Sequence, residues 1–456
     1  MQRPSVVILA AGKGKRMYSS MPKVLHPIAG EPMLAHVIRT ARALDPARLV
    51  VVYGHGGEQV RARIADADIQ WVEQSEQLGT GHALKMALPA LPQDGTTLVL
   101  YGDVPLTRLE TLQTLLSAAG EGMAVLTDIV DNPSGYGRIV RDAAGNAVAI
   151  VEEKDCDDTQ RQIQEINTGI LALPNAQLAD WLNSLKNDNA QGEYYLTDVL
   201  GLAHRAGVRV GSAVVPHSFE AAGVNNKVQL AELERIYQQN RALALMQAGV
   251  TLLDPTRIDV RGELVCGRDV SIDVNCIFEG QVELGDNVTV GAHCVLKNVK
   301  VAAGTQIAPF SLLEDSTVGE ACKIGPYARL RPGAALAGHV HIGNFVEVKK
   351  STIGEGSKVN HLTYVGDASI GSRVNVGAGC VTVNYNGVDK FRTVIEDNVF
   401  VGSGTLMVAP VTLEAGSTVG AGSVVTKNAP AGELTVARAR QVTIPGWKRP
   451  QKPSRS

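Results

Sequence analysis

A basic loop punctuated by glycines follows the first apolar run of the chain and is well suited to bind phosphate groups. The run Val6–Ile8 is rich in β-branched residues, which is typical of a buried strand. In the following segment Leu9–Lys23, read LAAGKGKRMYSSMPK, Gly12 and Gly14 can adopt positive φ and admit a ligand close to the backbone. Successive N–H groups in such a loop form an anion-binding concavity. Because residues 1–30 contain five Lys or Arg and no Asp or Glu, the segment predicts a site for a triphosphate or another polyanion.

The same loop departs from two common phosphate-binding patterns. A dinucleotide-binding loop would place a third glycine where Met17 stands. In a P-loop the last glycine is followed by Lys and then by Ser or Thr, whereas Gly14 is followed by Lys15 and Arg16. The pattern alone therefore leaves two alternatives open, a nucleotide-phosphate site and an ordinary basic turn.

The elements that position this loop alternate through residues 1–227. Strands are expected at Val6–Leu9, Leu49–Tyr53, Ile69–Glu73, Thr97–Tyr101 and Met123–Thr127, and helices at Pro32–Leu44, Gly81–Leu88 and Leu106–Ala118. Strands that alternate with helices indicate a largely parallel, doubly wound α/β sheet, whose ligands lie at the carboxyl ends of strands. The Gly12 loop and Gly102-Asp103 both follow such ends, so we expect them to lie at one edge of the sheet.

The second half of the chain has a different period. Residues 228–248 have helical spacing and contain no Gly or Pro, which predicts one connecting helix. Beyond residue 258, apolar residues recur six apart in four series: Ile272, Phe278, Leu284 and Val290; Val318, Ile324, Leu330, Leu336, Ile342 and Val348; Ile353, Val359 and Val365; Ile395, Val401, Met407, Leu413, Val419 and Val425. Such a period predicts a parallel β-helix of triangular coils with these residues pointing inward. The period breaks at Thr382–Val394, which we expect to project as a loop.

Composition narrows the class of protein. The 456 residues are 45% apolar and 20% charged, which fits two or three domains with buried cores. The net charge of −3 argues against bulk nucleic-acid binding. No apolar run approaches the ~20 residues of a membrane span, and the N-terminus does not have the pattern of a secretion leader. We therefore expect a cytoplasmic protein. The cysteines are scattered, without a C-x-x-C pair, at 156, 266, 276, 294, 322 and 380. We therefore expect them to be small buried hydrophobic residues in a reducing compartment.

A series of short stretches resembles one bacterial family, the bifunctional N-acetylglucosamine-1-phosphate uridyltransferases/glucosamine-1-phosphate N-acetyltransferases. The stretches are LAAGKGKRM with Pro22-Lys23, EQLGTGHA, YGDVPL, GYGRI, INTGI, QGEYYLTD, GVNN, LRPGA, GNFVEVKK, NHLTYVGDA, NVGAG and NYNG, and they extend from residue 6 to about residue 447. The resemblance implies a Rossmann-like α/β nucleotidyltransferase domain at 1–227, a helical linker at 228–248, and a left-handed parallel β-helix of hexapeptide repeats with a C-terminal tail at 249–456. The left hand comes from the resemblance, because the general preference for right-handed crossovers favours the opposite.

The resemblance also implies two reactions. Acetyl-CoA acetylates the amine of glucosamine 1-phosphate, and the phosphate of the resulting N-acetylglucosamine 1-phosphate then attacks the α-phosphate of UTP and releases pyrophosphate. The product, UDP-N-acetylglucosamine, feeds the synthesis of cell-wall peptidoglycan and lipopolysaccharide. The partners implied are these small molecules and two further copies of the chain, since the family is a homotrimer whose acetyltransferase sites are built from neighbouring chains.

By the resemblance, uridylyl transfer uses residues of the first domain. Arg16 and Lys23 hold the triphosphate and stabilise the transition state, which needs alignment and neutralised charge. Asp103 and Asn225 ligate Mg²⁺, which keeps several waters and needs few protein ligands. Further positions contact the nucleotide or the sugar: Leu9, Ala10, Ala11, Gly12, Gln74, Gly79, Thr80, Tyr101, Gly102, Gly137, Glu152 and Asn167.

Acetyl transfer is implied for the second domain. His361 matches the base that takes a proton as the amine attacks the thioester, and Glu347 matches a carboxylate that assists it. The positions for glucosamine 1-phosphate are Arg331, Lys349, Tyr364, Asn375 and Lys390. The positions for acetyl-CoA are Ala378, Asn384, Tyr385, Ser403, Ala421 and Arg438.

Three other functions compete with this interpretation. A sugar-1-phosphate nucleotidyltransferase with one activity could use the β-helix only for trimer assembly, but the residues around His361 and the loop with Asn384 and Tyr385 argue against it. A non-catalytic scaffold is disfavoured by the intact Arg16, Lys23 and Asp103. A zinc enzyme built on the solenoid would use the histidines at 339, 341 and 361, and nothing else in the sequence supports it.

Overall fold

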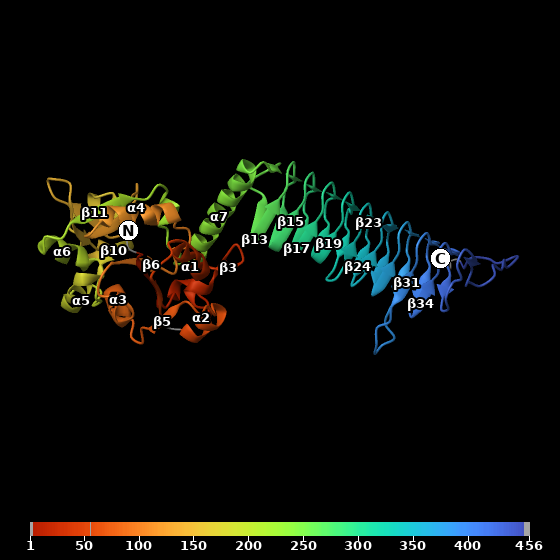
Figure 1. The fold of residues 1–456 in the computed structure, drawn as a ribbon, viewed down its shortest axis with the longest axis horizontal. Coiled ribbons are helices and arrows are strands. Elements are labelled where there is room, and N and C mark those ends of the chain that lie inside the picture. The colour runs from red at the N-terminus through yellow and green to blue at the C-terminus, as the bar shows by residue number, and fades with distance from the viewer. Residues whose placement is uncertain (1–2, 55, 451–456) are drawn as a thin grey trace, which may run out of the picture. The chain divides into compact units, whose positions relative to one another are not determined.

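The chain folds into two compact units, Met1–Asn240 and Arg241–Ser456 (Figure 1). The structure is a computed structural model that describes residues 3–54 and 56–450. Among the described helices, none combines the length and the apolar character needed to cross a bilayer. Each unit has a core of its own and is described separately below.

A twisted sheet forms the centre of the first unit, in the strand order β11-β7-β10-β6-β1-β4-β5. The bounds of these strands are β1 Ser5–Ala10, β4 Arg48–Tyr53, β5 Gln70–Glu73, β6 Thr96–Tyr101, β7 Met123–Ile129, β10 Glu165–Pro174 and β11 Val210–Val214. The strands β6, β1, β4 and β5 are parallel, and β1 is buried along its whole length. The strand positions expected in this part of the chain are confirmed, and their carboxyl ends meet at one edge of the sheet.

The sheet also contains antiparallel strands. Strand β10 runs antiparallel to both of its neighbours, β6 and β7. A hairpin of β8 (Arg138–Arg141) and β9 (Ala147–Val151) joins β10 through β8. Alternating apolar runs reveal the presence of a strand but not its direction. The main order of the sheet is largely parallel, as expected, and β10, which lies between β7 and β6, is the strand whose direction the pattern did not indicate.

Helices cover both faces of the sheet. The helices are α1 Met33–Ala43, α2 Gly57–Arg63, α3 Thr80–Ala87, α4 Leu109–Ala119, α5 Asn175–Ser184 and α6 Asp198–Arg205, and a short hairpin pairs β2 Pro27–Ile28 with β3 Glu31–Pro32. One buried cluster joins α1 and α4 to Val6 and Ile8 of β1. A second cluster joins α3, α5 and α6 to Val7 and Leu9, which point to the opposite face because successive strand residues alternate.

Helix α7 (Lys227–Gln247) confirms the helix expected at 228–248. Its first half belongs to the first unit, where Leu233 is buried in a cluster with Met17, Ile28 and Val224. The Glu234 carboxylate accepts the N–H of Ala29 at 2.7 Å in the same unit.

The second unit is a parallel β-helix. Its described strands form an eleven-stranded sheet of β12 Thr251–Leu252, β14 Ser271–Ile272, β16 Thr289–Val290, β18 Gln306–Ile307, β20 Lys323–Ile324, β23 His341–Asn344, β26 Lys358–His361, β29 Asn375–Val376, β32 Phe400–Val401, β35 Thr418–Val419 and β37 Leu434–Thr435. A fifteen-stranded sheet, branched at β19, contains β13 Ile258–Cys266, β15 Cys276–Leu284, β17 Val295–Val301, β19 Leu312–Val318, β21 Arg329–Leu330, β22 Ala335–Leu336, β24 Glu347–Lys349, β25 Thr352–Ile353, β27 Tyr364–Gly366, β28 Ala368–Ile370, β30 Val381–Val383, β31 Thr393–Ile395, β33 Leu406–Val408, β34 Val411–Leu413 and β36 Val424–Val425.

The six-residue period gives this unit its core. All residues of the four series named above are buried in one continuous apolar cluster that runs the length of the coil. Hydrogen-bonded neighbours on successive coils are commonly 17 residues apart, but the coil that contains Thr382–Val394 separates Ala378 from Ser403 by 25. The extra residues project as a loop, as the break in the period predicted (Figure 1).

The cysteines are free thiols, as expected. Five are buried, and four of these, Cys276, Cys294, Cys322 and Cys380, lie in the core of the β-helix. Burial raises the pKa of Cys276 to about 11 and that of Cys294 to about 12. These thiols therefore remain protonated at neutral pH and act as small hydrophobic groups.

Candidate active sites

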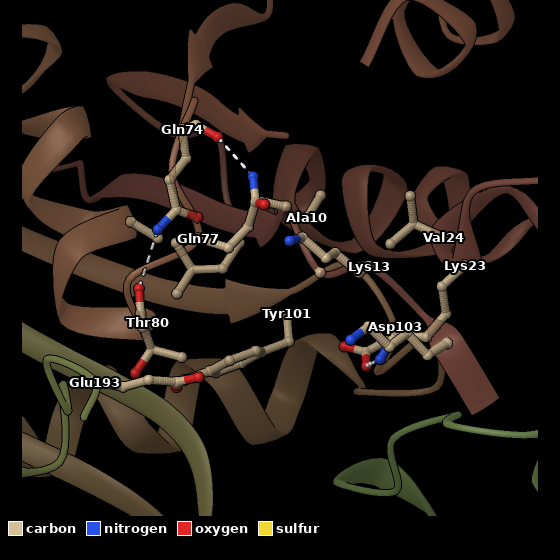
Figure 2. Close-up of a pocket in the computed structure, with 16 residues that line it drawn as sticks. Ala10, Lys13, Lys23, Val24, Gln74, Gln77, Thr80, Tyr101, Asp103 and Glu193 are labelled. Atoms are coloured by element: carbon tan, nitrogen blue, oxygen red, sulfur yellow. Dashed lines mark hydrogen bonds and ion pairs between the residues drawn. The ribbon is translucent and has the colours of Figure 1, made fainter. Parts of the chain in front are cut away.

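A cavity of about 550 Å³ lies at the carboxyl ends of β1 and β6 in the first unit (Figure 2). It is lined by Leu9, Ala10, Ala11, Gly12, Lys13, Lys15, Lys23, Val24, Gln74, Gln77, Gly79, Thr80, Ala83, Tyr101, Asp103 and Glu193. The glycine loop after β1 therefore faces Asp103 after β6, because β1 and β6 are adjacent parallel strands. The volume is in the range of pockets that hold a small organic ligand.

One end of the cavity presents amide groups (Figure 2). The Gln74 side chain is 3% exposed, and its Nε2 donates to the carbonyl oxygen of Gly79 at 3.1 Å. Gln77 Nε2 donates to the Gln74 carbonyl oxygen at 3.0 Å. Gly79 has φ of +110°, and a Cβ there would lie 2.6 Å from the Tyr194 carbonyl oxygen, so only glycine fits. Fixed donors and acceptors of this kind can recognise the edge of a nucleobase.

The other end of the cavity is charged (Figure 2). Lys23 forms an ion pair with Asp103, and the two side chains are 14% and 17% exposed. Lys23 Nζ also donates to Asn225 Oδ1 at 3.3 Å. Asp103 follows β6 whereas Asn225 precedes α7, yet their side-chain oxygens converge on one cationic group. A carboxylate and an amide oxygen aimed at a common point form a donor set that a hard divalent cation prefers, so these residues fit the magnesium role implied for them.

Between these ends the structure places the half-buried phenol of Tyr101 near the half-buried carboxyl group of Glu152. Burial, followed by the nearby carboxylates of Glu152 and Asp103, raises the pKa of Tyr101. Burial also raises the pKa of Glu152, which accepts a hydrogen bond from Thr197 Oγ1 at 3.2 Å. The Tyr101 hydroxyl therefore stays neutral and can donate a hydrogen bond to a sugar or phosphate oxygen.

Close packing holds the Tyr101 ring. Gly169 has φ of +86°, and a Cβ there would lie 2.7 Å from the ring. Asn167 anchors this bend, since its Oδ1 accepts the Gly169 N–H at 2.9 Å while its own N–H donates to the Gly137 carbonyl oxygen at 2.8 Å. Asn167, Gly137 and Glu152 thus support the wall of the cavity, although they are not among its lining residues.

The remaining residues of the nucleotide set lie next to the cavity. Gly102 donates its N–H to the Leu9 carbonyl oxygen at 2.9 Å and so ties the ends of β6 and β1 together. Arg16 is exposed on the 3₁₀ turn Lys15–Met17, and the basic side chain that lines the cavity from this turn is Lys15.

Several lining residues were not assigned a role from the sequence. Lys13 and Lys15 were recognised only as part of the basic loop. Gln77 and Glu193 stand inside the stretches EQLGTGHA and QGEYYLTD, so those motifs carried a signal that could have identified them. Ala83 ends the stretch EQLGTGHA, whereas Val24 is apolar and stands outside the quoted stretches.

In the second unit His361 ends β26 with its ring exposed. Its Nδ1 lies 3.0 Å from Asn344 Oδ1 on the preceding coil, in register with it. Because an amide oxygen can only accept, this contact places the proton on Nδ1 and leaves the lone pair on Nε2 of the neutral ring. His361 is thereby oriented to accept a proton from a ligand.

A cationic cluster lies on adjacent strands of the same coils. Arg331 Nη1 donates to Glu347 Oε1 at 2.7 Å, and this hydrogen bond raises the pKa of Arg331. Glu347 is opposite Tyr364 in the pairing of β24 with β27, and Lys349 is two residues farther along β24. The Tyr364 ring lies over Gly366, where a Cβ would be 2.3 Å from the hydroxyl oxygen. Arg331, Lys349 and the Tyr364 hydroxyl can together bind a phosphate group.

The positions assigned to acetyl-CoA form pairs on the following coils. The Ala378 N–H donates to Ser403 Oγ at 3.2 Å. Arg438 Nη1 donates to the Ala421 carbonyl oxygen at 2.7 Å.

The projecting loop carries the other assigned positions. At its base, Asn384 Nδ2 donates to Asp367 Oδ2 at 2.5 Å. Tyr385 and Lys390 form a β-bridge within the loop. Asn375 lies outside this loop, on β29, and pairs in register with Phe400 of β32.

Two of the three histidines considered for a zinc site contact other side chains. His339 Nδ1 contacts Glu355 Oε1 at 2.6 Å, and His361 contacts Asn344. Within residues 3–54 and 56–450, no three His, Cys, Asp or Glu side chains gather at a spacing suited to a metal ion.

Comparison with known proteins gives matches in both units. A MobA-like NTP transferase domain matches residues 6–161, a GMPPB C-terminal domain matches 260–344, and a hexapeptide repeat of succinyl-transferase matches 392–427. The chain is 76% identical over 454 residues to the bifunctional protein GlmU of Chromobacterium violaceum, with 100% of both chains covered. It is 60% identical over 448 residues to the bifunctional protein GlmU of Azoarcus sp. strain BH72, with 98% of this chain and 99% of the relative covered.

Proposed function

The chain belongs to the family of bifunctional GlmU proteins, and we propose that each of its two units carries one of the two activities. It is an enzyme of UDP-N-acetylglucosamine synthesis that acts both as a uridyltransferase and as an acetyltransferase. We assign uridylyl transfer to residues 1–227 and acetyl transfer to residues 249–456, with 228–248 as the linker. The observation that carries the first assignment is the cavity in which a basic glycine loop faces Asp103, whose carboxylate shares the Lys23 ammonium with the side-chain oxygen of Asn225.

In the uridylyl transfer site, the chain supplies alignment and positive charge. Lys13, Lys15 and Lys23 line the cavity and would surround the UTP triphosphate. Arg16 is exposed on the same turn and would contact the triphosphate from outside the cavity wall. A phosphate oxygen of N-acetylglucosamine 1-phosphate forms the new bond to the α-phosphorus of UTP, and the bond from that phosphorus to the bridging oxygen of pyrophosphate breaks. Charge on the leaving pyrophosphate is balanced by these cations, which is the main catalytic contribution available to phosphoryl transfer.

Two residues hold the metal ion in this proposal. The GlmU nucleotidyltransferases indicate a divalent metal requirement, and Asp103 and Asn225 are the residues that would bind Mg²⁺. When bound there, Mg²⁺ would withdraw negative charge from the phosphate oxygens of the nucleotide. The uracil lies against Gln74 and Gly79, and the Tyr101 hydroxyl donates toward the sugar phosphate.

In the acetyltransferase site, His361 acts as the general base. Its Nε2 takes a proton from the amine of glucosamine 1-phosphate as the nitrogen attacks the thioester carbon, and CoA leaves as the thiol. Arg331, Lys349 and Lys390 bind the sugar phosphate, and Glu347 holds Arg331 in place. Asn384, Tyr385 and the pairs Ala378–Ser403 and Ala421–Arg438 contact acetyl-CoA.

We also propose that the protein is a homotrimer in the cytoplasm. The hexapeptide repeats and the GlmU relatives support trimer formation, and copies of the chain would then complete each acetyltransferase site. The free, largely buried thiols fit a reducing compartment. UTP and acetyl-CoA are the co-substrates.

A single incubation tests the proposed function. The purified protein is mixed with glucosamine 1-phosphate, acetyl-CoA, UTP and Mg²⁺, and free thiol and pyrophosphate are followed separately. We expect both products, with pyrophosphate lagging behind thiol because the acetylated sugar must form first. Pyrophosphate only when acetylated sugar phosphate is supplied would instead indicate a nucleotidyltransferase with a structural β-helix, and neither product would indicate a scaffold.

A further inference from the structure

Glu220 is a fully buried carboxylate outside the cavity, with an exposed fraction of 0%. It ends the 3₁₀ turn Ser218–Glu220 and faces the first turn of α4. The backbone N–H of Arg108 donates to its Oε2 at 3.3 Å, and the Thr111 hydroxyl donates to the same oxygen. Arg108 Nε lies 3.9 Å from its Oε1.

These contacts connect the two segments that carry the proposed metal ligands. Asp103 lies five residues before Arg108, and Asn225 lies five residues after Glu220. The Thr107 hydroxyl donates to the Glu220 carbonyl oxygen at 2.7 Å. Closer to the cavity, the Val224 N–H donates to the Asp103 carbonyl oxygen at 2.9 Å. The segments 103–111 and 218–225 are therefore held together at several points.

A carboxylate at a fully buried position destabilises the folded state unless its interactions offset the loss of hydration. Burying a charge carries a desolvation penalty, which an apolar side chain of similar size would not incur. The N-terminus of α4 reduces the penalty, because its free N–H groups and dipole favour a negative charge. In return, the carboxylate binds Arg108 and Thr111 with directional hydrogen bonds that apolar packing could not supply.

We propose that Glu220 is a positioning residue that sets the separation of Asp103 and Asn225 and thereby tunes divalent-cation binding in the uridyltransferase site. The proposal rests on the proposed function of that site. Glu220 does not line the cavity, so it acts only through the segments that carry the two ligands. Its Oε2 accepts both hydrogen bonds, whereas its buried Oε1 has no hydrogen-bond partner among the described residues and lies 3.9 Å from Arg108 Nε. Loss of the carboxylate charge and of the hydrogen bonds to Oε2 would let these segments shift relative to each other, and the oxygens of Asp103 and Asn225 would no longer converge.

Three variants of the full-length protein test this role. Glu220→Gln keeps the side chain's shape but replaces one acceptor oxygen with a donor. Thr111→Val removes the hydroxyl partner and leaves Glu220 in place. Glu110→Gln is the matched control, because Glu110 is exposed in the first turn of the same helix and the change removes the same charge.

Two readouts are measured for each variant. The first is the Mg²⁺ concentration that gives half-maximal pyrophosphate release at saturating UTP and acetylated sugar phosphate. The second is binding of Mn²⁺ without turnover, measured by electron paramagnetic resonance with UTP present. We expect both to weaken by about 10–100-fold in Glu220→Gln, the range for loss of a group that orients a metal ligand. Thr111→Val should weaken them in the same direction, Glu110→Gln should match wild type, and thiol release should be unchanged in all three.

The outcomes separate this proposal from the function on which it rests. Wild-type protein that neither binds Mn²⁺ nor releases pyrophosphate would refute the uridyltransferase assignment itself. Wild-type activity with metal titrations of Glu220→Gln and Thr111→Val that equal those of Glu110→Gln would overturn the role of Glu220. If Glu220→Gln does not fold, Thr111→Val decides the question, since an unchanged Mn²⁺ affinity in that variant also overturns the role.

Discussion

Replacing Lys23 with Met tests how strongly the cation-binding end of the cavity depends on a positive charge. The Lys23 and Asp103 side chains are 14% and 17% exposed, and the ammonium also contacts Asn225 Oδ1 at 3.3 Å. Methionine keeps an unbranched side chain but removes the charge, so the Asp103 carboxylate and the Asn225 oxygen lose their shared partner. Breaking a buried ion pair costs about 3–5 kcal/mol, and an exposed pair contributes about 0.2–1 kcal/mol. For this largely buried pair we expect a loss of about 2 kcal/mol.

Thermal unfolding gives the measurement. A change of 1 kcal/mol shifts the midpoint by about 2–4 °C in a unit of this size, so Lys23→Met should melt about 4–8 °C below wild type in metal-free buffer. The transition of the first unit can be followed by tryptophan fluorescence, because Trp71 and Trp181 lie in that unit and Trp181 is buried. Millimolar Mg²⁺ should narrow the gap, since the cation binds the oxygens that Lys23 neutralises in wild type.

Lys13→Met is the matched control for this experiment. Lys13 lines the same cavity but is exposed, so its replacement should lower the midpoint little. Equal midpoints for the two variants in metal-free buffer would refute the assigned importance of the Lys23–Asp103 pair. Equal shifts with Mg²⁺ in Lys23→Met and wild type would refute competition between the ammonium and the metal for the same oxygens.

Three further predictions concern other parts of the molecule. Burial raises the pKa of Glu152, so the folded state loses stability as pH rises from the unfolded value of 4.5 through the raised pKa; Glu152→Gln should therefore gain stability relative to wild type over that range in urea unfolding. Asn344→Ala removes the hydrogen bond that orients His361 and should slow thiol release about five- to tenfold, from roughly 1–1.5 kcal/mol per hydrogen bond. A chain cut after residue 227 should be less stable than one cut after residue 247 by at least about 2 kcal/mol in chemical unfolding, because it loses the buried Leu233.

Each of these predictions has a control. Glu153 is a neighbouring carboxyl group whose pKa is lowered by its hydrogen bond with Arg138. Glu153→Gln should therefore lose stability relative to wild type as pH rises, whereas Glu152→Gln gains it. Asn344→Ala should leave pyrophosphate release unchanged, and an equal loss of both reactions would indicate a general folding defect. Equal stability of the two shortened chains would show that α7 does not support the first unit.

The β-helix is the part of the fold that could be predicted from the sequence in most detail. The six-residue spacing predicted the β-helix and its buried positions. The prediction was possible because every sixth residue points inward, so the same apolar requirement recurs along the sequence. Strand β10 illustrates the limit, because its apolar run gave no sign that it pairs antiparallel with both neighbours. Pairing direction depends on how distant segments connect, and a local pattern does not contain that information.

In the candidate sites too, local motifs could be recognised in the sequence, whereas contacts between distant segments could not. Motifs located the glycine loop and Asp103, but the contacts of Lys23 with Asp103 and Asn225 span 80 and 202 residues of sequence. Glu220 stood in no assigned motif, and its importance emerges only from its burial against α4. The same holds for the 3₁₀ turn at Lys15–Met17, which puts Lys15 rather than Arg16 on the cavity wall.

The assignment of one reaction to each unit is tested most directly by measuring both reactions in Asp103→Ala and His361→Ala. Thiol release is measured from glucosamine 1-phosphate and acetyl-CoA, and pyrophosphate release from N-acetylglucosamine 1-phosphate, UTP and Mg²⁺. We expect Asp103→Ala to lose pyrophosphate release and keep the wild-type rate of thiol release. His361→Ala should lose at least about 100-fold in thiol release, the contribution typical of a positioned base, and keep the wild-type rate of pyrophosphate release. Loss of both reactions in either folded variant, or wild-type thiol release in His361→Ala, would contradict the assignment.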